Sequence, residues 1–372
     1  MIKSESLSSV WLSEIRKRYG KDPAIMEAMI YALFLLEQLK LSGLEFIFKG
    51  GTSLVLLMDH PKRFSVDIDI IIKPTVTKEI LEAYLSKILA SKVFIKMGLD
   101  ERRSYQEGIP KAHYKFYYVS NVGARDREGN VASNPKREIL LDIVFSENTY
   151  PVTHEVPIET EWLLQEGEPV KVIIPDIDSI AGEKLTAFAP NTTGVPYGLG
   201  KEKEIMKQLF DIGSLYEELS DIEIVKQSFH RSVKAEIGYR PEKKIESAER
   251  VLEDIIDTSL LISGIVSISK SEKSLPLKEI NSGINQFRHY LFEGSFGIIE
   301  AKVASSKAAL LAAIILNDRK GGLPVFNSDL PLTDYLIKNT DYNYLNKRLK
   351  FIEKGEALFY WFHTLNILFP DK

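Results

Sequence analysis

The sequence contains no cysteine, which excludes disulfide bonds, thiolate metal sites and cysteine nucleophiles. It has no excess of positive charge either, because its formal net charge is −4, so any contact with nucleic acid must use a local patch. Its most prominent apolar run, residues 308–316, is shorter than the about 20 residues that a membrane span needs. With an N-terminus that lacks a signal-peptide core, these features predict a soluble cytoplasmic protein.

Several motifs that would indicate other functions are also missing. The sequence has no phosphate-binding Gly-x-x-x-x-Gly-Lys-Ser/Thr loop and no Gly-x-Ser-x-Gly nucleophile elbow. Its six histidines do not stand at the spacings of a zinc site.

Helix and strand patterns divide the chain into two parts. The first part, residues 1–175, predicts an α+β domain built on a mixed sheet, and the second, residues 176–372, predicts mainly helices. The helical signals in the first part cover residues 23–41, 53–58 and 77–91, and the strand signals cover residues 44–48, 65–72, 112–119, 138–145 and 170–174. Asp22 and Pro23 mark the start of the first of these helices.

A glycine pair stands between a predicted strand and a predicted helix, in the segment Lys49–Gly50–Gly51–Thr52–Ser53. Glycine lets backbone N–H groups approach an anion closely, and the helix that follows adds partial positive charge at its N-terminus. The hydroxyl groups of Thr52 and Ser53 add hydrogen-bond donors. The segment therefore predicts a cradle for nucleotide phosphates, with an ordinary strand–turn–helix connection as the alternative.

Two aspartates follow on the next predicted strand. Asp67 and Asp69 are two residues apart, so their side chains should project from one face of the strand. Paired carboxylates repel one another, and a divalent cation relieves that repulsion; carboxylate oxygens are the ligands that Mg²⁺ prefers. The sequence thus predicts a magnesium site here, and the alternative is an exposed edge strand with solvated acids.

A third aspartate, Asp142, lies in the apolar predicted strand 138–145. If this strand pairs beside the strand of Asp67 and Asp69, three carboxylates converge, and three can hold two magnesium ions in phosphoryl-transfer chemistry. Asp142 could also accept the proton of an incoming hydroxyl group. The alternatives are a strand-end aspartate and an aspartate paired with Arg137.

These motifs resemble those of the AbiEii/AbiGii toxin family, which includes the MenT toxins of abortive-infection and type IV toxin–antitoxin systems. The resemblance rests on FKGGTSL at residues 48–54 and RFSVDID at residues 63–69. Weaker similarity continues in PDIDSIAGEKL at residues 175–185 and QLFDI at residues 208–212, where Gln208 and Leu209 depart from the family's basic–acidic pair. The resemblance implies a nucleotidyltransferase fold of the polymerase-beta-like kind, with the helical domain completing the active-site cleft.

The resemblance also implies roles for individual residues. Lys184 would contact a nucleotide phosphate, and Asp211 would orient that lysine or the nucleotide. The alternative for Lys184 is a solvated helix lysine that pairs with a nearby acid. Arg63 would reach a phosphate or brace the loop before the aspartate strand. The predicted catalytic residues are Asp67, Asp69, Asp142, Lys184 and Asp211, of which the first three are also the predicted metal ligands. The predicted nucleotide-binding residues are Lys49, Gly50, Gly51, Thr52, Ser53, Arg63 and Ser65.

The predicted function is magnesium-dependent transfer of a nucleoside monophosphate from an NTP to a hydroxyl group, with release of pyrophosphate. By resemblance, the acceptor would be RNA, in particular the tRNA 3′ end, and the protein would be a toxin with a cognate antitoxin partner. Two alternatives remain: an enzyme that modifies a protein or a small molecule, and a nucleotide-binding module without catalytic activity.

Overall fold

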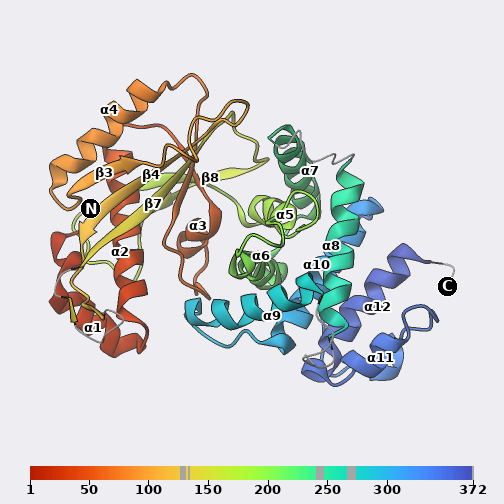
Figure 1. Cartoon of the computed structure of the whole chain (residues 1–372). Helices are drawn as coiled ribbons and strands as arrows, with labels where there is room; N and C mark the ends of the chain where they lie inside the picture. The colour runs from red at the N-terminus through yellow and green to blue at the C-terminus, as the bar shows by residue number, and fades with distance from the viewer. Residues whose placement is uncertain (126–130, 133–134, 240–246, 266–273, 371–372) are drawn as a thin grey trace. The chain divides into compact units, whose positions relative to one another are not determined.

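The computed structural model describes residues 1–125, 131–132, 135–239, 247–265 and 274–370. The chain forms two compact units, Met1–Asp176 and Ile177–Lys372. Strands occur in the first unit, and the described part of the second unit is helical, as the colours of Figure 1 show.

A seven-stranded mixed sheet forms the centre of the first unit, with the strand order β3-β4-β7-β2-β1-β9-β8. The pairs β2–β7 and β1–β9 are parallel and the other pairs are antiparallel. The predicted α+β class with a mixed sheet is therefore confirmed. The strands of the sheet are β1 (Ile47–Lys49), β2 (Ile68–Ile72), β3 (Lys96–Leu99), β4 (Lys111–Val119), β7 (Lys136–Phe145), β8 (Thr153–Pro157) and β9 (Lys171–Pro175). A separate short pair joins β5 (Ala124–Arg125) to β6 (Val131–Ala132).

Strand β2 lies in the interior of this sheet, between β7 and β1. Ile68 and Ile70 are fully buried, which is why so apolar a strand takes a central position. The alternative of an exposed edge strand for the two aspartates is therefore wrong. The strand begins at Ile68 rather than at the predicted residue 65, so Asp67 precedes it.

Two helices cover one face of the sheet. Helix α2 (Pro23–Leu41) begins as predicted, because the Asp22 carboxylate accepts the N–H groups of Ala24 and Ile25. The ring of Tyr31 in α2 stacks on Tyr118 of β4, with the ring centres 3.8 Å apart. Helix α4 (Lys78–Ile88) joins this face through a hydrogen bond between Glu82 and the hydroxyl of Tyr114. The opposite face carries the predicted site.

Two further helices complete the first unit, α1 (Ser9–Tyr19) and α3 (Gly50–Leu57). Helix α3 begins at Gly50, immediately after β1, rather than at the predicted residue 53. The glycine pair therefore belongs to the first turn of the helix.

The second unit is a helical assembly in which α5 packs closely on α7. Gly182 permits this approach, since a Cβ atom there would lie 2.5 Å from the backbone oxygen of Val225. Its helices are α5 (Ile177–Ala187), α6 (Glu202–Leu215), α7 (Ile222–Gly238), α8 (Ala248–Ser263), α9 (Leu275–Phe287), α10 (Ile298–Leu316), α11 (Tyr344–Leu349) and α12 (Glu356–Leu368). Across the described residues, no helix combines the length and the apolar character needed to cross a bilayer.

Candidate active site

The junction of β1 and α3 brings a glycine against a carboxylate. Gly50 adopts a φ of +79°, in the left-handed region that L-residues rarely occupy. A Cβ atom at this position would collide with the carboxylate of Asp69. A glycine is thus needed at position 50 for two reasons. Its backbone can turn the chain from β1 into α3, and its lack of a Cβ atom leaves room for the Asp69 carboxylate.

The hydroxyl groups that follow the glycines are buried. The Thr52 hydroxyl donates to the backbone carbonyl of Asp67 at 2.5 Å and lies 2.8 Å from the Ser65 hydroxyl. The Ser53 hydroxyl donates to the carbonyl of Gly50 at 2.8 Å. In this arrangement Thr52, Ser53 and Ser65 connect the first turn of α3 to the segment that leads into β2. Phosphate binding at α3 would then use the backbone N–H groups of its first turn, which have no partners within the helix.

Arg63 is buried beneath the same turn. Its guanidinium lies against Gly51, where an added Cβ would strike it, and donates to the backbone carbonyl of Phe64 at 3.0 Å. The alternative role for Arg63, bracing the loop before β2, is the one that these contacts support.

Four side chains on neighbouring strands form one row, which we call the charged row, across the face of the sheet opposite to α2 and α4. Lys49 on β1 is the register partner of Asp69 on β2, Asp69 that of Asp142 on β7, and Asp142 that of His113 on β4. Register partners point to the same face of a sheet. The predicted pairing of the β2 and β7 strands is therefore present, and it places Asp69 beside Asp142.

The third predicted ligand, Asp67, lies two residues before Asp69 and outside the strand. Within the described residues, no group of three or more His, Asp or Glu side chains is arranged to hold a metal ion. Magnesium does not require such a group, because it is usually bound by one or two carboxylates together with waters and substrate phosphates. The pair Asp69–Asp142, partly exposed beside the N-terminus of α3, fits that mode of binding.

The charged row contains one residue that sequence analysis missed. His113 Nδ1 lies 2.6 Å from Oδ1 of Asp142. Both alternatives for Asp142 are wrong, since this aspartate lies inside β7 and its partner is His113, while Arg137 points to the opposite face. A histidine among the outward positions of β4 was the available signal, but its partner depends on strand register.

In the second unit, the structure pairs the two residues that the family resemblance singled out. The Lys184 ammonium of α5 lies 2.9 Å from the Asp211 carboxylate of α6 and donates to the Gln208 side-chain oxygen at 3.0 Å. Both charged groups are buried, with 6% of Lys184 and 2% of Asp211 exposed. The solvated lysine of the alternative is therefore wrong, whereas its pairing with a nearby acid is present. Gln208, which departs from the family pattern, is itself a partner of Lys184.

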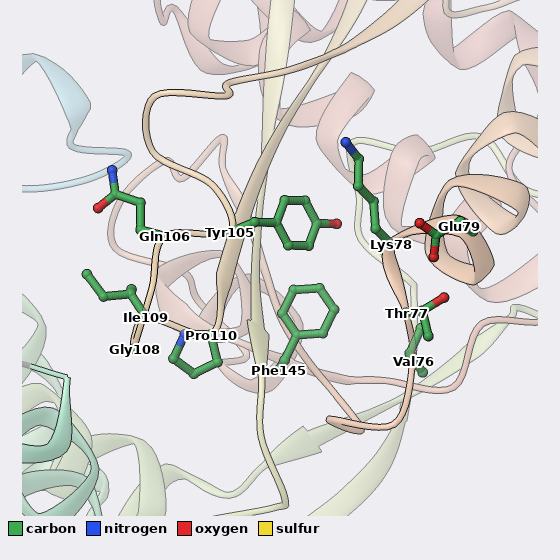
Figure 2. A pocket seen from close by; sticks show the side chains of 10 residues that line it. All are labelled: Val76, Thr77, Lys78, Glu79, Tyr105, Gln106, Gly108, Ile109, Pro110 and Phe145. Carbon is green, nitrogen blue, oxygen red and sulfur yellow. The ribbon is translucent and has the colours of Figure 1, made fainter.

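A pocket of about 620 Å³ lies at the ends of β2 and β7, apart from the charged row. Figure 2 shows the rings of Tyr105 and Phe145 side by side in it, with their centres 5.7 Å apart. The Lys78 ammonium lies 5.6 Å from the centre of the Tyr105 ring. The lining is mostly apolar, and the pocket is broadly open to solvent.

Comparison with known proteins adds one positive finding. The family model described as "Nucleotidyl transferase AbiEii toxin, Type IV TA system" matches residues 34–269, which is more than half of the chain. The match includes the charged row and the Lys184–Asp211 pair. A search of curated proteins found no match to this chain.

Proposed function

The chain belongs to the AbiEii nucleotidyl transferase toxin family of type IV toxin–antitoxin systems, and from this membership we propose that it transfers a nucleoside monophosphate from an NTP to an RNA hydroxyl group. The preferred acceptor is the tRNA 3′ end. The observation that carries the proposal is the adjacency of Asp69 and Asp142 beside the N-terminus of α3.

The proposed reaction is a substitution at the α-phosphorus of the NTP. The acceptor oxygen forms a bond to that phosphorus, the bond to the β-phosphate oxygen breaks, and pyrophosphate leaves with the bonding electron pair. The acceptor's proton passes to a carboxylate such as Asp142 or to solvent. Backbone N–H groups of Gly51 and its neighbours in α3 would donate to the phosphate oxygens.

Asp69 and Asp142 would hold Mg²⁺, with Asp67 as a third oxygen donor once a nucleotide is bound. Bound there, the cation would neutralise charge on the triphosphate and on the leaving group. With Asp67 included, the three carboxylates are still expected to hold two magnesium ions.

Lys184 would supply a further positive charge to the nucleotide phosphates. An ammonium group has three N–H donors, so a phosphate oxygen can be bound in addition to Asp211 and Gln208. Asp211 would keep the ammonium oriented, as the buried ion pair suggests. The family assignment also implies an antitoxin as the protein partner.

A small-molecule acceptor, a protein acceptor and a nucleotide-binding module without catalysis are the alternatives. The pocket in Figure 2 does not favour the first of these, because it lies apart from the charged row.

A transfer assay separates these possibilities. The purified protein is incubated with Mg²⁺, each α-labelled NTP in turn, and total RNA, total protein or a metabolite extract. Asp69→Asn is the test variant, because it removes one carboxylate charge with little change in volume. Glu155→Gln is the matched control, since Glu155 is an exposed carboxylate on β8 of the same sheet.

We expect label on RNA of tRNA size with the wild type and with Glu155→Gln, and none with Asp69→Asn. Label on protein or on a small molecule would keep the enzyme class and overturn the RNA acceptor. A folded wild type that labels nothing would overturn the proposed transferase activity and favour the binding module.

A further inference from the structure

The His113–Asp142 contact is a short polar contact within the charged row and has no counterpart in the sequence motifs. Nδ1 of His113 and Oδ1 of Asp142 are 2.6 Å apart, within the range of a charge-assisted hydrogen bond. The two side chains are 14% and 29% exposed, so water competes for this contact only in part. Because a carboxylate only accepts, Nδ1 must carry the hydrogen, and the hydrogen bond fixes the tautomer of the ring.

His113 is itself held firmly in the sheet. Its backbone N–H donates to the Ser104 hydroxyl at 2.8 Å, and its carbonyl accepts the backbone N–H of Asp100 at 2.8 Å. On the other side it is the register partner of Asp142 in the long antiparallel ladder of β4 and β7. The imidazole therefore projects from a backbone that the segment 100–104 holds on one side and β7 holds on the other.

Asp142 needs such a partner because Asp69 lies directly beside it. Two neighbouring carboxylates repel, and a free aspartate side chain would rotate away from its neighbour. A donor on Oδ1 fixes the rotation of the carboxylate and leaves Oδ2 to face a ligand. Metal-binding carboxylates commonly accept such hydrogen bonds, which set their orientation.

We propose that His113 is the positioning residue of the acidic pair: its Nδ1–H orients the Asp142 carboxylate so that Asp69 and Asp142 bind one divalent cation together. This inference rests on the proposed function, because it assigns His113 a role at the proposed magnesium site. A purely structural role is a weak explanation, since partly exposed ion pairs add little to folding stability.

The test is a titration of the metal-free protein with Mn²⁺ alone, with free Mn²⁺ counted by electron paramagnetic resonance. His113→Ala removes the donor, whereas His113→Asn places an amide N–H the same number of bonds from the backbone as Nδ1. His154→Ala is the matched control, because His154 is exposed on β8 of the same sheet. Thermal unfolding of each variant verifies that it is folded.

We expect His113→Ala to bind Mn²⁺ about 10–100-fold more weakly than the wild type, the usual cost of losing a hydrogen-bond partner of a metal ligand. His113→Asn should recover most of that loss, and His154→Ala should bind like the wild type. In the transfer assay, His113→Ala should need more Mg²⁺ for half-maximal rate without a matching rise in KM for RNA.

Equal Mn²⁺ affinity of His113→Ala and the wild type would overturn the inference and leave the proposed function intact. Equal losses in His113→Ala and His113→Asn would also overturn it, because donation by Nδ1 would then not be the cause. A wild type that binds no Mn²⁺ would overturn the magnesium site, and the role of His113 with it.

Discussion

Replacing Gly50 with alanine should damage both the stability of the first unit and the acidic pair. The φ of +79° costs an L-residue about 1–2 kcal/mol. The new Cβ would also displace the Asp69 carboxylate, and an off-rotamer side chain costs about 0.5–1.5 kcal/mol more. The sum of about 1.5–3.5 kcal/mol corresponds to a fall in Tm of roughly 3–14 °C for a unit of this size.

The activity loss should be larger than the stability loss suggests. Displacing a reacting or metal-binding group by about 1 Å can cost roughly 100-fold in rate, and the added Cβ would displace the Asp69 carboxylate from its present position. Scanning calorimetry measures the first effect and the transfer assay measures the second, at a temperature where the variant is folded.

Gly20→Ala is the matched control for this experiment. Gly20 ends α1 with a φ of +64°, but a Cβ there would meet no atom within 4 Å. It should therefore lose only the backbone contribution of about 1–2 kcal/mol and keep full activity. The reasoning is refuted if Gly50→Ala is no less stable than Gly20→Ala and transfers nucleotide at the wild-type rate.

Three further predictions concern the second unit. Asp211→Asn should destabilise the protein by about 3–5 kcal/mol in urea unfolding, because it leaves the buried Lys184 ammonium without its counter-charge. The double variant Lys184→Met/Asp211→Leu should recover much of that loss. Burial lowers the pKa of His363 from 6.5. The contribution of this residue to the free energy of unfolding is therefore complete above pH 6.5 and is lost as the pH falls. His363→Phe should weaken this pH dependence in unfolding titrations between pH 7 and 5. Gly182→Ala should cost about 1–3 kcal/mol through overlap with the α7 backbone, whereas Gly238→Ala, where the added Cβ meets nothing within 4 Å, should not destabilise the protein in the same measurement.

Local signals predicted the elements whose ends are set by local chemistry. Helix α2 begins at Pro23 because Asp22 caps it, and both features are visible in the sequence. Helix α7 carries signals of the same kind, an Asp221 cap and apolar residues at helical spacing from Ile222, within the part of the chain predicted to be mainly helical.

The contacts of the site residues depend on the pairing of strands that are distant in the sequence, and this limited what could be predicted. The apolar character of β2 and β7 indicated buried strands, and their pairing followed as a conditional expectation. The partner of Asp142 could not be obtained in this way, because it depends on the register of β4 against β7, which a shift of one residue would change completely. Sequence reasoning therefore found the acids and missed His113.

The Lys184–Asp211 pair supports a functional interpretation of the second unit. Removing two charges from water is costly, and apolar side chains of similar volume often give equal or greater stability than a buried ion pair. Folding alone would thus not require a lysine and an aspartate that are 6% and 2% exposed between α5 and α6. The pair holds an ammonium group in a fixed orientation, with Gln208 as a second acceptor. A transferase needs such a preorganised cation for nucleotide phosphates, so the proposed role of Lys184 would account for the cost of burying it.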